Sequence, residues 1–181
     1  HVAVGSTHLV LDLPVGKTMK IRHEEDAKKI LVKFQTLGKH FGIKVVGNIT
    51  HTKEPAGNGV GPALEARDVL KVLEQTGDRP IQLEERALQL ASQLLDLCYK
   101  DSREKKDGMT EAKRILKDGT ALTKFRQIVR AQGGDDGITS NTIKIHANSH
   151  HVKALYKGVV TRVNNYNLSS IAKLLGAPHD R

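Results

Sequence analysis

The sequence predicts an α/β fold, which we take to be part of a mixed sheet with helices. Two short runs rich in strand-forming residues, at residues 7–13 and 43–50, flank a segment with helical periodicity at residues 23–41. A strand, a helix and a strand in so short a span form a βαβ unit, whose strands should be parallel. A helical block follows this unit, and beyond it the pattern changes to that of the start of a small α+β domain.

The first three elements each carry local signals. Residues 7–13, "THLVLDL", are short and apolar, which is typical of a buried strand. Residues 23–41 place apolar side chains on one helical stripe, and three acids occupy the first turn, where they suit the helix dipole. Either Gly38 or Gly42 is suited to end this helix, because glycine readily adopts the left-handed conformation of helix ends. The run "IKVVGNIT" at residues 43–50 predicts the second strand.

The helical block is predicted to contain four helices. The first covers residues 63–75, and the second starts at Pro80 and carries a long stripe of leucine and alanine. The third covers residues 110–117, with Thr110 as its N-cap. A glycine breaks the pattern after it, and the fourth helix resumes at residues 122–131.

A glycine and aspartate cluster, "QGGDDG" at residues 132–137, marks the clearest domain boundary. We therefore assign residues 1–134 to the C-terminal part of an α/β domain. Residues 135–181 are assigned to the beginning of a C-terminal domain that is cut short. In that domain residues 152–155 and 159–163 alternate like strands, and residues 167–175 have a helical pattern.

Composition narrows the classes of function. The net charge of +9 attracts phosphates, but the basic residues are dispersed, and three Phe, three Tyr and no Trp offer few stacking platforms for nucleic acid. A basic nucleic-acid-binding module is therefore the alternative function, and a solvated basic surface is the simpler interpretation. One cysteine excludes an internal disulfide, and no apolar run is long enough to span a membrane. We expect a cytoplasmic protein without a membrane partner.

The stretch "EPAGNGVGPALEARD" at residues 54–68 follows the second strand, at the edge where open α/β sheets place their ligands. Its glycines do not form the dinucleotide fingerprint, and Pro62 lacks an amide that would face a phosphate. Glycines do permit a tight turn with inward-facing carbonyls, which favour a cation, and Glu65 or Asp68 could add a carboxylate. A plain loop-to-helix junction is the simpler alternative.

The loop after the first strand contains "GKT", which looks like the end of a P-loop. That motif needs another glycine at position 11, where Leu11 stands, so we reject it. Asp12 lies within the apolar run of the first strand. We expect it to cap the neighbouring loop, with a ligand contact as the alternative. The active edge of the sheet is therefore expected at residues 14–18 and 54–61.

Four segments, in order, resemble the thymidine phosphorylase and pyrimidine nucleoside phosphorylase family. "VAVGSTHLVLDLPVGKTMKI", residues 2–21, resembles the strand and loop that follow the family's nucleobase-binding helix. Residues 54–70 resemble its glycine-rich loop and helix. Residues 126–135 resemble the helix end that leads to the C-terminal domain, and residues 157–178 resemble the start of that domain. The resemblance spans nearly the whole chain and implies a C-terminal fragment of such a protein.

Two details resemble the long branch of this family, which contains archaeal AMP phosphorylases and bacterial thymidine phosphorylase-like proteins. They are the loop end "GKTMK" and the helix "GPALEARD". Shorter pyrimidine nucleoside phosphorylases carry an apolar residue near position 20, whereas the corresponding lysine of the AMP phosphorylases contacts the nucleotide. The resemblance therefore implies Lys20 as a substrate-binding residue whose ammonium meets a substrate phosphate. From the sequence alone, a surface lysine is the alternative.

In some relatives the glycine-rich loop supplies backbone oxygens and a helix carboxylate to a structural monovalent cation such as K⁺. The matching positions here are Ala56 and Gly59 for the carbonyls and Asp68 for the carboxylate. Asp68 stands where those relatives have glutamate, which is one methylene longer. This difference bears directly on whether the carboxylate reaches a cation.

By resemblance, the family's reaction is reversible phosphorolysis, in which inorganic phosphate attacks the anomeric carbon and a base and a pentose 1-phosphate form. The resemblance implies a thymidine or pyrimidine nucleoside phosphorylase, a pentosyltransferase. An AMP or nucleoside 5′-monophosphate phosphorylase is the alternative. The family's phosphate-binding loop and its base-binding arginine, serine and lysine lie upstream of His1, so we expect this chain alone to be inactive. The complete protein is expected to be a homodimer or a higher oligomer.

Overall fold

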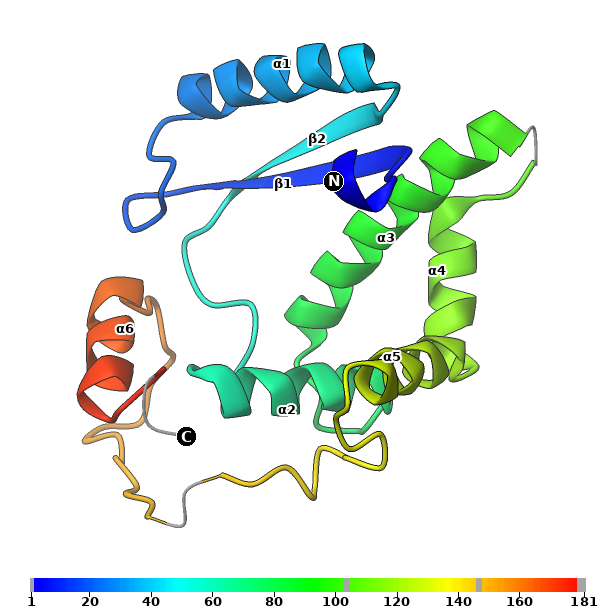
Figure 1. The fold of residues 1–181 in the computed structure, drawn as a ribbon. Coiled ribbons are helices and arrows are strands. Elements are labelled where there is room, and N and C mark those ends of the chain that lie inside the picture. Colours follow the sequence, from blue (N-terminus) through cyan, green and yellow to red (C-terminus); the bar gives the residue numbers. More distant parts are fainter. Residues whose placement is uncertain (1, 103–104, 146–147, 179–181) are drawn as a thin grey trace. The chain divides into compact units, whose positions relative to one another are not determined.

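The computed structural model describes residues 2–102, 105–145 and 148–178 of the chain. Over these residues it contains six α-helices and a two-stranded parallel sheet, so the predicted α/β class is confirmed (Figure 1). None of the helices in the described ranges combines the length and the apolar character that crossing a membrane requires.

The chain forms two compact units, each of which is discontinuous in sequence. Unit 1 contains His1–Lys53 and Glu84–Ala121, and unit 2 contains Glu54–Leu83 and Leu122–Arg181. Each unit is described by itself below. The domain boundary near Asp135 stays a prediction.

The centre of unit 1 is a pair of parallel strands, β1 (His8–Val15) and β2 (Lys44–His51). Their register runs from His8 opposite Lys44 to Val15 opposite His51. Between them in sequence, helix α1 (Glu24–Phe41) runs back along the sheet (Figure 1). Parallel strands need such a crossover, so the predicted βαβ unit is confirmed.

One face of this sheet packs against α1. Side chains alternate between the two faces of a strand, and Leu13 and Val15 of β1 form a buried cluster with Ala27 of α1. Further apolar side chains pack around this cluster, from Leu11, Ile21, Ile30, Leu31 and Ile49. A slip of one residue would turn this apolar set to the other face, so the layer fixes the register.

Two glycines let α1 approach β2 closely. A Cβ at Gly38 would lie 2.6 Å from the backbone oxygen of Ile43 and 2.6 Å from Cγ2 of Val45. A Cβ at Gly47 would lie 2.3 Å from Cδ1 of Leu31. The helix ends at Gly42, which has a φ of 70°. Of the two glycines suited to end the helix, Gly42 therefore does so, and Gly38 serves packing.

Polar side chains on the other face of the sheet form hydrogen bonds with side chains of helix α3 (Ile81–Ser102). Near the C-terminal end of α3, Asp101 accepts hydrogen bonds from Lys44 and from Nε2 of His8, the latter at 2.8 Å. Lys44, followed by His8, lowers the pKa of the Asp101 carboxyl below its ordinary value. These contacts tie α3 to the amino ends of both strands.

Helix α4 (Gly108–Lys117) shows where a predicted cap was wrong. Its N-cap is Asp107, whose carboxylate accepts the backbone N–H of Thr110 at 2.7 Å. Aspartate and threonine are both preferred N-caps, and the earlier of the two takes the position. Thr110 is instead the third residue of the helix and supplies the amide that is capped.

Unit 2 contains helix α2 (Pro62–Leu73), most of α5 (Thr120–Ala131) and α6 (Asn165–Leu174). The carboxylate of Glu74, which follows α2, accepts bonds from the backbone N–H of Ser140, at 3.0 Å, and from its hydroxyl. Ser140 is buried. This contact holds the segment after α5 against the C-terminal end of α2.

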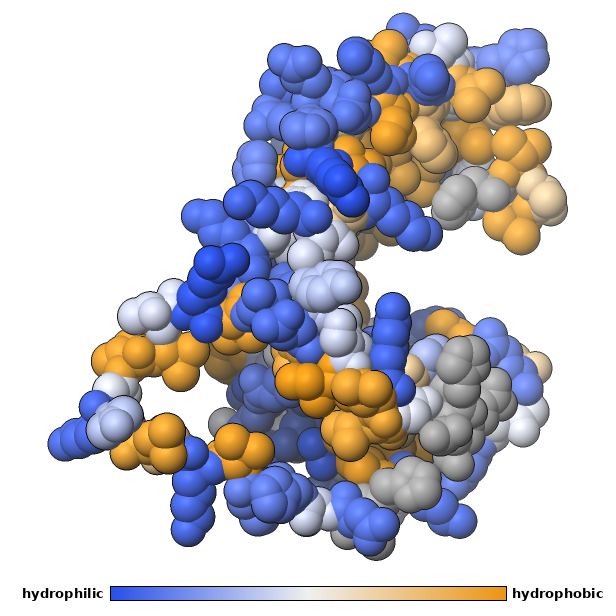
Figure 2. Space-filling model, turned by 90° about the vertical axis from the view of Figure 1, so that its left-hand side faces the viewer, coloured by the Kyte–Doolittle hydropathy of each residue, from blue (hydrophilic) through white to orange (hydrophobic). Residues whose placement is uncertain are grey.

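The two strands predicted between residues 152 and 163 are not formed, since these residues are in neither helix nor strand. Val152, Leu155 and Val159 are 90%, 88% and 89% exposed. A strand needs a neighbour to pair its backbone groups, and the described chain provides none here. Hydrophobic side chains also reach the surface at several places on the face seen in Figure 2.

The close approach at Gly38 gives a first prediction. Gly38→Ala should lower the free energy of unfolding by about 1–3 kcal/mol, because the added methyl group overpacks the contact with Ile43 and Val45. Urea unfolding of the variant and the wild type measures this change. Gly77→Ala is the control, because a Cβ at Gly77 meets no atom within 4 Å. Equal stability of the two variants would contradict the packing.

Candidate functional site

A closed turn follows β1 at the carboxyl end of the sheet. The N–H of Gly16 donates to the carbonyl of Ile21 at 3.2 Å, and the N–H of Met19 donates to the carbonyl of Gly16 at 3.0 Å. The N–H of Thr52 donates to the carbonyl of Val15 at 2.9 Å, which ties the residues after β2 to the same place. A Cβ at Gly16 would lie 2.7 Å from the carbonyl oxygen of Thr52, so a glycine is needed where the turn starts.

Lys20, the predicted substrate-binding residue, lies in this turn and is exposed. Lys17 in the same turn is also exposed. Neither lysine has an ion-pair partner within the described ranges. Two ammonium groups that no carboxylate of the described residues neutralises are suited to meet an anionic ligand at a strand end.

The acid-rich first turn of α1 follows this turn in sequence, and its Glu24 is paired with other side chains. Oε1 of Glu24 lies 2.7 Å from Nζ of Lys28, and Oε2 lies 3.2 Å from Nε2 of His51 at the end of β2. Lys28, ahead of His51, lowers the pKa of the Glu24 carboxyl below its ordinary value. Glu24 is therefore ionised at neutral pH and already paired.

The glycine-rich loop of unit 2 is built around Asp68. This residue is only 3% exposed, and its Oδ2 accepts the backbone N–H of Asn58 at 2.6 Å and of Gly59 at 2.7 Å. A Cβ at Gly57 would lie 2.8 Å from the same Oδ2, and one at Gly59 would lie 2.5 Å from the backbone of Leu64. The glycines are therefore required because the loop folds tightly onto the helix that follows it.

The same loop is joined to the start of α2. Gly61 is the N-cap, with a φ of 110°, and Pro62 is the first helical residue. Oε1 of Glu65 accepts the N–H of Gly61 at 3.1 Å. A left-handed φ favours glycine and proline suits the first helical position, so the sequence "GP" sets the helix start.

The structure thus brings together two of the three residues predicted to hold a cation. Gly59 contacts Asp68 through its amide. The role of Ala56 and the binding of a cation stay predictions. A buried carboxylate is an oxygen ligand of the kind that a cation takes, but the loop groups that the structure places on its Oδ2 are the amides of Asn58 and Gly59. Within the described ranges no group of three or more His, Cys, Asp or Glu side chains is placed to hold a metal ion.

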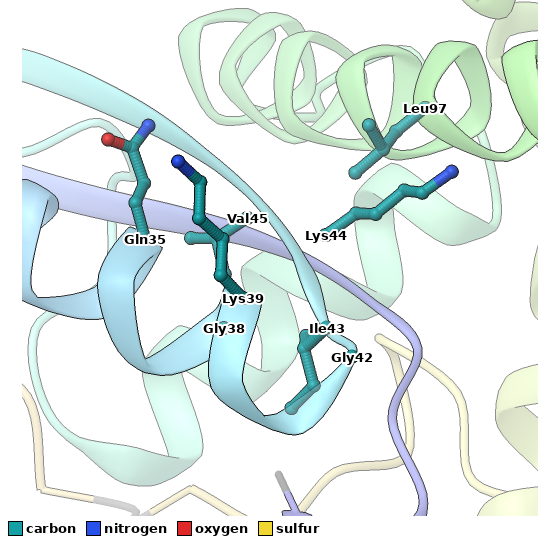
Figure 3. A pocket seen from close by; sticks show the side chains of 8 residues that line it. All are labelled: Gln35, Gly38, Lys39, Gly42, Ile43, Lys44, Val45 and Leu97. Atoms are coloured by element: carbon teal, nitrogen blue, oxygen red, sulfur yellow. The ribbon is translucent and has the colours of Figure 1, made fainter.

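Lys20 lies in unit 1 and the glycine-rich loop in unit 2. The expectation that residues 14–18 and 54–61 form one active edge stays a prediction. A pocket of about 590 Å³ in unit 1 lies at the other end of the sheet, beside the amino end of β2. Figure 3 shows Gln35 and Lys39 projecting from α1, and Leu97 of α3 on the side of Lys44. This pocket does not contain the predicted substrate residue.

Sequence reasoning missed one polar network in unit 1. The expectation that Asp12 caps a loop is wrong, because its Oδ2 lies 2.7 Å from Nη2 of Arg86 in α3. Nη2 of Arg86 also donates to Oγ1 of Thr50 at 3.2 Å. Two signals could have found this pair. Asp12 is a lone acid in an apolar strand, and Arg86 is a lone arginine on a leucine and alanine stripe.

Comparison with known proteins shows homology over nearly the whole chain. A protein of Ralstonia nicotianae named "Putative thymidine phosphorylase" is 38% identical over 98% of this chain and 34% of its own length. "Putative thymidine phosphorylase 2" of Acidovorax sp. is 40% identical over 97% of the chain and 33% of its own length. "AMP phosphorylase 1" of Archaeoglobus fulgidus is 35% identical over 99% of the chain and 34% of its own length.

The chain therefore spans about a third of the length of the curated relatives that it matches. No protein-family model matches it.

The contacts of Asp68 give a second prediction. Asp68→Ala should lower the free energy of unfolding by about 2–5 kcal/mol, because the amides of Asn58 and Gly59 lose a charged acceptor. Asp68→Asn should cost less, since the side-chain oxygen can still accept. Chemical denaturation measures both changes, and the exposed Glu65→Gln serves as the control, with a loss below about 1 kcal/mol. A loss for Asp68→Ala no larger than this control would show that the loop does not depend on Asp68.

Proposed function

Because this chain belongs to the family of proteins named thymidine phosphorylase and AMP phosphorylase, we propose that the complete protein is a nucleoside phosphorylase. The homology over 97–99% of the chain is the observation that carries this proposal. In the proposed reaction an oxygen of inorganic phosphate forms a bond to the anomeric carbon of the sugar, and the bond from that carbon to the base nitrogen breaks. The products are the free base and a pentose 1-phosphate.

Such a reaction depends on holding an anion beside a sugar, and on stabilising charge that grows on the leaving base. This chain contributes the carboxyl edge of a parallel sheet, which is the usual ligand edge of α/β folds. At that edge the turn after β1 presents two lysines without carboxylate partners among the described residues. We assign this turn to substrate binding and no residue of this chain to bond breaking.

A pyrimidine nucleoside such as thymidine is the first candidate substrate, and a nucleoside 5′-monophosphate such as AMP is the second. The exposure of Lys20 favours the second, because an ammonium without a partner carboxylate pairs readily with a phosphate. In this proposal Lys20 binds the 5′-phosphate of the substrate. A nucleoside lacks that group and gains nothing from the charge.

We further propose that the glycine-rich loop binds K⁺ through carbonyl oxygens of Ala56 and Gly59 and the carboxylate of Asp68. The burial of Asp68 supports this assignment, and the bonds from the amides of Asn58 and Gly59 keep its carboxylate beside the loop. The cation would hold the loop in one conformation and takes no part in bond breaking.

The role of Lys20 gives a third prediction, made for the complete protein. Release of free base in the presence of phosphate should be measured for thymidine and for AMP, by chromatography. Lys20→Ala should lower kcat/KM for AMP by about 10–100-fold, the effect of losing a hydrogen bond to a charged group. It should change kcat/KM for thymidine by less than about twofold, since thymidine has no phosphate to lose.

Lys17→Ala is the matched control, because Lys17 is an exposed lysine of the same turn. An equal loss in the two variants would indicate a general effect of positive charge rather than a specific contact of Lys20. A complete protein that releases no base from either substrate would refute the proposed function.

The cation gives a fourth prediction. Replacing K⁺ by tetramethylammonium at constant ionic strength should lower the melting temperature of the wild-type protein, because a ligand of the folded state stabilises it by mass action. Asp68→Asn keeps an acceptor for the amides but removes the negative charge, so its melting temperature should no longer respond to K⁺. A response of equal size in both proteins would place the K⁺ effect elsewhere.

A further inference from the structure

We propose that Arg86 is a positioning residue for the glycine-rich loop, because it joins the two ends of the segment that carries this loop. The inference extends the proposed function, and rests on it only for the activity measurement described below.

The network around Arg86 lies wholly in unit 1 and joins three elements. Nη2 of Arg86 in α3 donates to Oδ2 of Asp12 in β1 at 2.7 Å and to Oγ1 of Thr50 in β2 at 3.2 Å. Oγ1 of Thr50 also donates to Oδ1 of Asp12 at 3.3 Å, and Nδ2 of Asn48 lies 3.5 Å from the same oxygen. Asp12 stands opposite Asn48 in the strand register, so Asp12, Asn48 and Thr50 share the face of the sheet that Arg86 of α3 contacts.

The network lies beside two points where the chain passes from one unit to the other. The chain leaves unit 1 after Lys53 and returns at Glu84, and the segment between these points contains the glycine-rich loop and α2. Thr50 lies three residues before the exit, and Arg86 lies two residues after the return. The hydrogen bond between Arg86 and Thr50 therefore links the residues that precede and follow the segment Glu54–Leu83.

A contribution to folding stability alone does not explain why an ion pair stands at this place. The side chains of Arg86 and Asp12 are 30% and 25% exposed, and partly buried ion pairs contribute little net stability compared with apolar side chains of the same size. A pair of apolar side chains, however, would not fix the orientation of α3 relative to β2. The planar guanidinium of arginine holds its acceptors at defined angles, so it sets where β2 ends relative to where α3 begins.

Helix α3 also provides a matched comparison. Its far end is tied to the same sheet face by Asp101, which bonds to Lys44 and His8. Asp101→Asn loosens the same helix at a point remote in sequence from both chain crossings. A role in positioning therefore predicts different effects at the two ends of α3, whereas a purely structural role predicts similar ones.

The test is hydrogen–deuterium exchange of the complete protein, read on peptides that cover residues 54–61. The amides of Asn58 and Gly59 are bonded to Asp68 and report on the closed loop. The double variant Asp12→Asn with Arg86→Met removes both charges and leaves neither unpaired, which favours folding. We expect exchange of the loop to become at least about tenfold faster in it, the factor for losing a hydrogen bond to a charged group.

Asp101→Asn should leave exchange of these peptides unchanged, and Thr50→Val should raise it less than the double variant does. Unchanged exchange in the double variant would overturn the inference. An equal rise in Asp101→Asn would also overturn it, because loosening of α3 as a whole would then explain the effect.

Activity provides a second readout that separates this inference from the proposed function. The K⁺ concentration for half-maximal base release should rise about tenfold in the double variant and stay unchanged in Asp101→Asn. A wild-type protein without phosphorolysis would refute the proposed function, and the exchange measurement would still decide the role of Arg86.

Discussion

The parallel pairing of β1 with β2 is the constraint on which the rest of unit 1 depends. Because the strands run in the same direction, the chain must return through α1, and both strands end at the same edge. The register that buries Leu13 and Val15 against Ala27 also sets Asp12 beside Asn48 on the opposite face. The apolar layer, the polar network and the turn that carries Lys20 are thus consequences of one alignment.

Asp68 plays a comparable part in unit 2, by electrostatics rather than by strand pairing. A carboxylate that is 3% exposed needs hydrogen-bond donors, and the amides of Asn58 and Gly59 supply them. These amides already compensate part of the negative charge. A cation at this place would therefore share the carboxylate with the loop itself, which suits a weakly demanding monovalent ion better than a divalent one.

Sequence reasoning succeeded where a pattern is local and periodic. It predicted β1, α1, β2 and the helices of both units within a few residues, because apolar spacing and glycine positions report directly on them.

Sequence reasoning failed where the deciding partner is distant in sequence. Asp12 and Arg86 are each a lone charge in an apolar pattern, but 74 residues separate them and no local pattern shows that they meet. The alternation at residues 152–163 likewise does not reveal whether a pairing strand exists. Thr110 was predicted as the N-cap of α4, and only the backbone path shows that Asp107 takes this position. Of the site residues, the chain pattern suggested Asp68, whereas Lys20 depended on family resemblance.

The exposed stretch around Val152, Leu155, Val159 and Val160 has a consequence for handling the protein in solution. Uncovered residues with high strand propensity offer free backbone groups to any neighbour, including an identical molecule. This 181-residue chain, expressed by itself and concentrated, should therefore form intermolecular β-structure that starts at this stretch. A charged replacement at Val159 would act as a gatekeeper against such aggregation.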